Sequence, residues 1–200
     1  MPLALKKYQQ DALDALASFL SRARGSGDPA QVERAFVEAR AEALGESVRR
    51  IPYRSWSPDG DSGHSVPLAC IRIPTGGGKT LLAAHAIDIA AREYVGTGAP
   101  VALWLVPSNA IRTQTLDALQ KAGHPYREAL LDHFAADRLT VIDIAECTQL
   151  RAQDFGGRAI VVVGTIQTLR VDNTAGREVY SYNEAFEPHF ATVPDMPFME

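Results

Sequence analysis

A run of three glycines, residues 76–78, stands directly before Lys79 and Thr80 in the stretch CIRIPTGGGKTLLAAHAIDIA. Glycine permits positive φ and, because it lacks a Cβ, lets the backbone approach a ligand closely. The apolar residues before the glycines predict a strand, and those after Thr80 predict a helix. A helix N-terminus offers unpaired N–H groups and a partial positive charge, so this loop is suited to holding a phosphate.

The two residues after the glycines supply the remaining parts of a nucleoside triphosphate site. Lys79 can reach the β- and γ-phosphates, and Thr80 can place its hydroxyl on Mg²⁺. The general loop pattern has its first glycine at position 73, where this chain has Ile73. A plain glycine-rich turn with an exposed lysine is the alternative, but the strand–loop–helix context favours the nucleotide site. We therefore expect Lys79 and Thr80 to be catalytic, with Thr80 the Mg²⁺ ligand.

The rest of the chain predicts the elements that position this loop. Hydrophobic periodicity and capping signals, including Asp28 and Pro29 at the start of the second helix, predict helices over 3–24, 30–44, 79–95 and 108–122. Short apolar runs predict strands over 68–73, 101–106, 139–144 and 159–164. Strands that alternate with helices favour an α/β fold, with a parallel sheet and helices on both faces.

Two segments resemble motifs of superfamily two helicases and translocases. The stretch PTGGGKT, residues 74–80, is similar to their motif I, which tolerates a residue other than glycine at the first position. Upstream, LKKYQQDA, residues 5–12, resembles their YQ element, in which the glutamine amide hydrogen-bonds adenine. The resemblance implies a RecA-like P-loop NTPase domain, preceded by a helical segment, that binds ATP and Mg²⁺. The ATP-binding residues that it implies are Tyr8, Gln9, Thr75, Gly76, Gly77, Gly78, Lys79 and Thr80.

Two further segments resemble the parts of these proteins that meet nucleic acid. The stretch VPSNAIRTQ, residues 106–114, is similar to motif Ia, and VVVGTIQTLR, residues 161–170, is similar to the T-x-Q-T/S-L segment. Such contacts go to the sugar-phosphate backbone, so the implied binding is independent of base sequence. DNA is the expected track from the resemblance, and the sequence leaves RNA as the alternative. The nucleic-acid-binding residues that the resemblance implies are Pro107, Ser108, Gln114, Thr165, Gln167 and Thr168. Ser108 is also a candidate helix cap, and both roles are compatible.

Residues 168–180, with Asn-Glu-Ala at 183–185, look most like DEAD/DEAH-box helicases related to the restriction subunit of type III restriction enzymes. That resemblance implies a DNA translocase with a modification or specificity subunit as a partner. Hydrolysis needs an Asp-Glu pair at a strand end. The nearest acid, Asp143, lacks an adjacent carboxylate and precedes the T-x-Q-T segment, so we interpret it as an ordinary strand-end residue.

We therefore expect a 1–66 helical segment followed by a partial helicase ATP-binding domain, 67–200, cut before its DEAH box. The remaining helicase domain would be a missing partner, and turnover by this chain alone would be negligible. A non-catalytic P-loop nucleotide-binding module and a small-molecule P-loop kinase are the alternatives.

Composition sets wider limits. The net charge of −4 gives no overall attraction to nucleic acid, although a local basic groove is compatible with it. The five histidines are scattered without metal-ligand spacing, and the two cysteines, Cys70 and Cys147, lie far apart. We expect a cytoplasmic protein without a membrane span.

Overall fold

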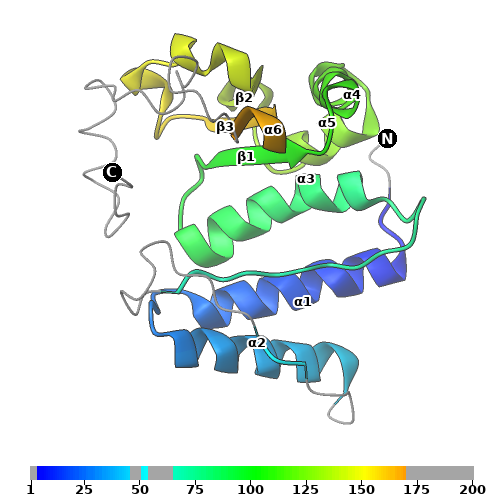
Figure 1. The fold of residues 1–200 in the computed structure, drawn as a ribbon, viewed down its shortest axis with the longest axis vertical. Helices are drawn as coiled ribbons and strands as arrows, with labels where there is room; N and C mark the ends of the chain where they lie inside the picture. The colour runs from blue at the N-terminus through cyan, green and yellow to red at the C-terminus, as the bar shows by residue number, and fades with distance from the viewer. Residues whose placement is uncertain (1–3, 46–50, 54–64, 170–200) are drawn as a thin grey trace. The chain divides into compact units, whose positions relative to one another are not determined.

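The computed structural model describes residues 4–45, 51–53 and 65–169, and they form two compact units (Figure 1). The described residues up to Thr97 form a helical unit, and those from Gly98 onward form a sheet unit. The glycine-rich loop belongs to the helical unit. The division expected between residues 66 and 67 remains a prediction.

The helical unit is built on α1, which contacts both α2 and α3 (Figure 1). Its elements are α1 (Lys7–Ala23), α2 (Pro29–Leu44), α3 (Lys79–Ile89) and the π-helical continuation η1 (Ala90–Val95). The predicted start of α2 is confirmed, because the Asp28 side chain accepts a hydrogen bond from the Ala30 N–H and Pro29 occupies the first turn. These helices are the expected ones, although α1 begins four residues later than the sequence pattern predicts.

The core of the helical unit joins all three helices to the segment that precedes the loop. Phe19 of α1, Val32 of α2, Leu82 of α3 and Ile73 belong to one buried cluster. Apolar burial of this kind contributes about 25 cal/mol per Å². The chain therefore enters the glycine-rich loop from a fixed point, because Ile73 is only 8% exposed.

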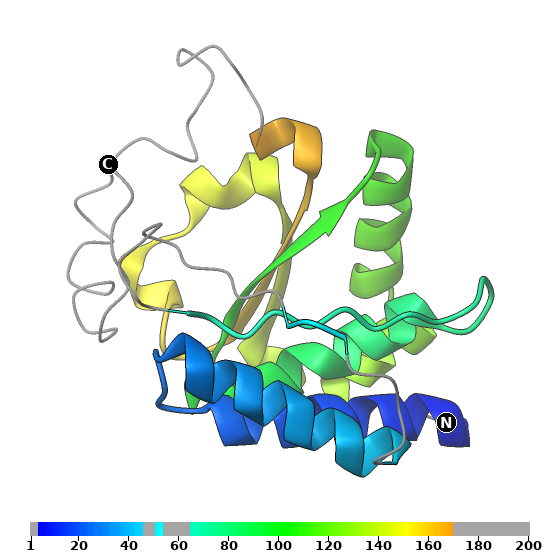
Figure 2. The ribbon, with the colours of Figure 1, turned by 60° about the horizontal axis from the view of Figure 1, so that its bottom comes forward.

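The strand expected at residues 68–73 is not present, and this prediction was wrong. The segment is extended but forms no strand (Figure 2, teal), and the side chains of Leu68 and Ile71 are exposed. Its apolar run predicted extended backbone, but ladder hydrogen bonds also need a neighbouring strand. Within the described residues of the helical unit, none of the long elements is a strand.

The sheet unit contains three parallel strands in the order β1-β3-β2. The strands are β1 (Val101–Val106), β2 (Leu139–Asp143) and β3 (Ala159–Thr165), all close to their predicted bounds. The helices are α4 (Asn109–Gln120), α5 (Pro125–Leu131) and the short α6 (Ile166–Leu169), with 3₁₀ turns η2 (Ala136–Arg138), η3 (Ile144–Gln149) and η4 (Ala152–Asp154). Val106 pairs with Thr165, and Asp143 pairs with Val163. The carboxyl ends of the three strands therefore meet at one edge of the sheet.

Helical segments flank this sheet. Ile160 and Val162 of β3 pack with Ile144 of η3 in one cluster. Val161 and Val163 alternate with them, face the opposite side and are fully buried. Helix α4 packs against all three strands. The predicted α/β architecture with a parallel sheet flanked by helices is confirmed.

Candidate nucleotide site and nucleic-acid interface

The glycine-rich loop turns through two residues with positive φ. Gly76 has φ of 79°, and Gly78, the N-cap of α3, has φ of 83°. Between them, the Gly77 N–H donates to the Pro74 carbonyl at 3.0 Å. A Cβ built on Gly76 meets nothing within 4 Å, so this side of the loop is open. The N–H groups in the first turn of α3 have no acceptor within the helix and are available to an anion.

Ile73 explains why this loop departs from the general glycine pattern. A Cβ added to Gly77 would collide with the Cγ2 of Ile73. The isoleucine is anchored in the helical core and fills the space that a side chain at position 77 would need. A bulky residue at the first position and a glycine four residues later are therefore complementary.

The side chains of Lys79 and Thr80 lie at the start of α3. The Lys79 ammonium donates a 3.1 Å hydrogen bond to the Pro74 carbonyl, which folds the side chain back over the loop. Ammonium has three donors, so this bond leaves the group able to bind an anion. Thr80 is half-buried in the first turn.

A cavity of about 520 Å³ adjoins the loop. It is lined by residues 71–77 on one side and by Tyr8 and Ala12 of α1 on the other. Its volume falls within the range of about 300–1,000 Å³ that ligand pockets occupy. Arg72 lines the cavity as well and was not singled out by the sequence patterns.

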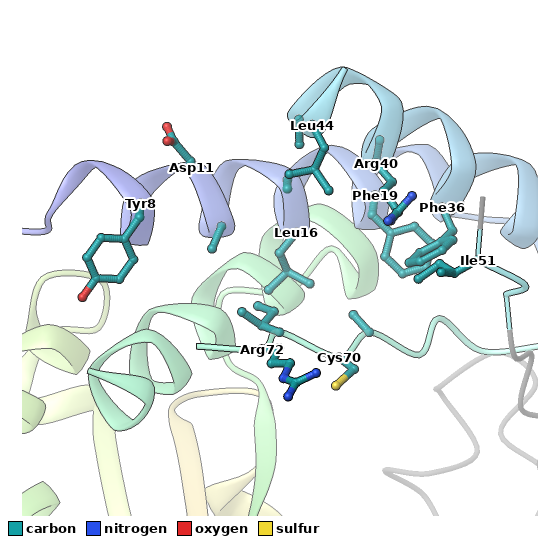
Figure 3. Close-up of a pocket in the computed structure, with 16 residues that line it drawn as sticks. Tyr8, Asp11, Leu16, Phe19, Phe36, Arg40, Leu44, Ile51, Cys70 and Arg72 are labelled. Carbon is teal, nitrogen blue, oxygen red and sulfur yellow. The ribbon is translucent and has the colours of Figure 1, made fainter. Parts of the chain in front are cut away.

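A second cavity, of about 460 Å³, continues along the groove between α1, α2 and residues 69–72 (Figure 3). Its lining is mostly apolar, and Phe19 and Phe36 lie at the end farthest from Tyr8 (Figure 3). Arg40 and Arg72 are the basic groups in this mostly apolar lining.

Tyr8 and Gln9 both donate to one carbonyl of the loop. The Tyr8 hydroxyl lies 3.0 Å from the Gly77 oxygen, and the Gln9 Nε2 lies 2.9 Å from it. The Gln9 Oε1 accepts a 2.8 Å hydrogen bond from the Lys6 N–H. Gln9 is buried, whereas Tyr8 is 43% exposed and lines the cavity.

In the sheet unit, the ends of β1 and β3 bring two of the predicted nucleic-acid segments together. The Gln167 Nε2 donates to the Pro107 carbonyl at 3.2 Å, across 60 positions of sequence. Ser108 caps α4, because its Oγ accepts from the Ile111 N–H at 3.4 Å. The predicted helix cap is confirmed. Gln114 is exposed farther along α4.

The two threonines of the T-x-Q-T segment bond to each other. Their Oγ1 atoms are 2.8 Å apart, and the Thr165 Oγ1 also accepts from the Thr168 N–H at 3.3 Å. Thr165 is only 3% exposed, so its hydroxyl shapes the turn between β3 and α6.

An ion pair lies at the same edge of the sheet. Arg112, in the first turns of α4, contacts the Asp143 Oδ1 at 2.8 Å, and both side chains are largely buried. Asp143 also caps η3 by accepting from the Ala145 N–H. Asp143 is the last residue of β2, which is the strand-end position expected from the sequence.

Burial, together with the negative charges of Asp143 and Glu146, raises the pKa of the nearby Cys147 thiol.

Comparison with known proteins decides the family. The family described as type III restriction enzyme, res subunit (ResIII) matches residues 2–192. The chain belongs to this family. Comparisons with curated proteins and with solved structures found no significant match.

Membership of the ResIII family gives the chain a helicase-like ATP-binding domain. The three-stranded parallel sheet and its flanking helices are consistent with the RecA-like fold of that domain. The resemblance to type III restriction subunits seen in the sequence is confirmed at the family level. The segments at 170–180 and 183–185, which suggested the subfamily, lie outside the described residues.

Some features of this ResIII chain escaped the sequence patterns. Asp88 is buried in α3 and pairs with Arg92 at 2.8 Å, which raises the pKa of the arginine. The i,i+4 spacing of Asp88 and Arg92 on a helix could have predicted this ion pair from the sequence. The Arg112–Asp143 pair could not be predicted from the sequence, because 31 positions separate its members.

Among the described residues, no cluster of metal-ligating side chains and no helix long and apolar enough to cross a membrane is found.

Proposed function

We propose that this chain is the ATP-binding part of a nucleic-acid-dependent ATPase, a DNA translocase of the type III restriction kind. The observation that supports it is the loop at the start of α3, where the open backbone at Gly76, the first-turn amides of α3 and the Lys79 ammonium lie within a few residues of one another. This arrangement suits a triphosphate, because amide donors and a positive charge meet on one small surface.

Each predicted ATP-binding residue has a place in this proposal. Residues 75–78 and Lys79 would hold the phosphates, and Tyr8 lines the cavity that adjoins residues 71–77. Gln9 keeps one N–H and one lone pair beyond its two bonds, and these could serve adenine. Thr80 would hold Mg²⁺, which fits its place in the first turn of α3. When bound, Mg²⁺ neutralises charge on the phosphates.

The nucleic acid would bind at the carboxyl edge of the sheet. Exposed Gln114 and Gln167 offer uncharged donors to a phosphate backbone, and the N-terminus of α4 at Ser108 offers helix amides. Pro107 is exposed beside them but has no N–H to donate, so its part would be apolar contact. Thr165 and Thr168 support this surface through their mutual bond. Such contacts carry no base information, so binding would be independent of sequence.

ATP turnover by this chain alone should be negligible. Asp143, the nearest acid to a magnesium role, is engaged by Arg112 and by the η3 cap. Hydrolysis would need an acid pair and a second helicase domain, with a modification or specificity subunit as a further partner of the whole enzyme. The proposal places the protein in the cytoplasm, in keeping with its two free cysteines.

The replacement Lys79→Ala tests the nucleotide site. Loss of a charged donor should weaken binding of a fluorescent ATP analogue by about ten- to hundredfold. Lys121→Ala, which removes an exposed lysine at the end of α4, serves as the control. Equal affinities for the parent chain and Lys79→Ala would refute the site.

A coupled ATPase assay tests the expected lack of turnover. DNA-stimulated ATP hydrolysis by this chain at a rate near a few per second would refute it.

A further inference from the structure

The carbonyl of Gly77 receives two side-chain donors from the start of α1, 68 and 69 positions away. A carbonyl oxygen has two lone pairs, and the Tyr8 hydroxyl and Gln9 amide together use both. This oxygen is therefore directed toward α1. Because a peptide unit is planar, the N–H of the next residue, Gly78, points the opposite way.

The orientation of that peptide matters for an anion. A loop that grips phosphate must present N–H groups and turn its carbonyl oxygens away, since oxygen would repel the ligand. Gly78 has φ of 83° and precedes the free amides of α3. Fixing the Gly77 oxygen against α1 thus fixes which side of the loop carries the donors.

Packing around the contact shows that it is built into the helical unit. Gln9 is 5% exposed, and its Oε1 is held by the Lys6 N–H. A Cβ on Gly78 would lie 2.5 Å from the Gln9 Nε2, so the amide sits directly against the loop. Tyr8 reaches the same carbonyl from the exposed side.

We propose that Tyr8 and Gln9 are positioning residues that orient the Gly77–Gly78 peptide for the triphosphate, whatever base the nucleotide carries. This inference rests on the proposed function, because it assumes that the loop binds phosphate. It assigns to both residues a role that needs no contact with the base.

Inorganic tripolyphosphate, which has no base, is the probe that tests this role. Its affinity for the chain, and that of ATP, would be measured with Mg²⁺ by calorimetry for the parent chain, Tyr8→Phe and Gln9→Met. Each variant loses one donor to the Gly77 oxygen without adding charge. Tripolyphosphate binding should weaken by roughly two- to tenfold in each. Gln10→Ala, one position along the same helix and exposed, should leave it unchanged.

The outcomes separate the inference from the proposed function. Unchanged tripolyphosphate affinity in Tyr8→Phe and Gln9→Met, with weaker ATP binding, would overturn the positioning role and leave a base contact. A parent chain that binds neither ATP nor tripolyphosphate would overturn the proposed function itself. If the parent chain binds ATP but not tripolyphosphate, the base-independent role is overturned while the nucleotide site stands. If Tyr8→Phe unfolds at the same temperature as the parent chain, its effect is on binding rather than on folding.

Discussion

The amide of Gln167 donates a 3.2 Å hydrogen bond to the carbonyl of Pro107 and so ties the end of β3 to the end of β1. The two strands are parallel neighbours, and Val106 is paired with Thr165 immediately before the contact. Two segments predicted from sequence to meet nucleic acid therefore form one continuous surface. The contact is exposed, so a nucleic-acid backbone can reach both sides of it.

Replacing Gln167 with alanine should weaken binding of single-stranded DNA. The change removes both the proposed phosphate donor and the hydrogen bond to Pro107, and a loss of about two- to tenfold is expected. Fluorescence anisotropy with a labelled oligonucleotide of mixed sequence would measure it. Gln153→Ala, an exposed glutamine in η4 of the same unit, is the matched control. Equal affinity for Gln167→Ala and Gln153→Ala would remove Gln167 from the proposed surface.

Asp143→Asn should strengthen DNA binding. The carboxylate now neutralises Arg112, which lies on the helix whose N-terminus is proposed to face phosphate. Asparagine keeps the capacity to cap η3 but releases the guanidinium charge. Each additional phosphate contact steepens the dependence of log K on log salt by about 0.7 for a single strand. A salt series would measure this slope.

A change in bulk charge must be separated from the release of Arg112. Asp117→Asn removes the same charge from an exposed position on α4 and should produce a smaller gain. If Asp117→Asn and Asp143→Asn gave the same slope and affinity, Arg112 would have no part in binding.

Local signals in the sequence predicted much of this fold. The bounds of β1 match the VALWLV run, and the caps of α2 and α4 follow from Asp28 and Ser108, because strand burial and helix capping depend on neighbouring residues. The failure to predict the structure of residues 68–73 has the opposite cause. An apolar run specifies extended backbone, but only another part of the chain can complete a ladder.

The site shows the same division. Residues 76–80 predict a phosphate loop from sequence alone, because glycine and lysine chemistry is local. The structure shows the positive φ at Gly76 and Gly78, and the phosphate-binding role stays a prediction. The two hydrogen bonds from Tyr8 and Gln9 to the Gly77 carbonyl could not be predicted from the sequence, since they span nearly 70 positions. The packing of Ile73 over Gly77 likewise depends on the tertiary structure, and it explains the departure from the glycine pattern.

Gly78→Ala should destabilise the helical unit more than Gly25→Ala does. Both glycines have positive φ, which costs an L-residue about 1–2 kcal/mol. Only Gly78 is crowded, because its added Cβ would lie 2.5 Å from the Gln9 Nε2, whereas Gly25 has open space. Displacing Gln9 should add about 1 kcal/mol to the loss in free energy of unfolding. Urea unfolding followed by circular dichroism would measure both, and equal losses would show that the Gln9 contact contributes nothing.

Alkylation of Cys147 should require a higher pH than alkylation of an ordinary thiol. The thiolate is the reactive form, and burial, followed by the charges of Asp143 and Glu146, raises the pKa and disfavours that form. In a Cys70→Ser chain, where Cys147 is the remaining thiol, the rate with iodoacetamide should rise through a midpoint above that of a short cysteine peptide. Glu146→Gln should move the midpoint down, because it removes one of the repelling charges. A midpoint at or below that of the peptide, or one that Glu146→Gln leaves in place, would contradict this account of the carboxyl edge.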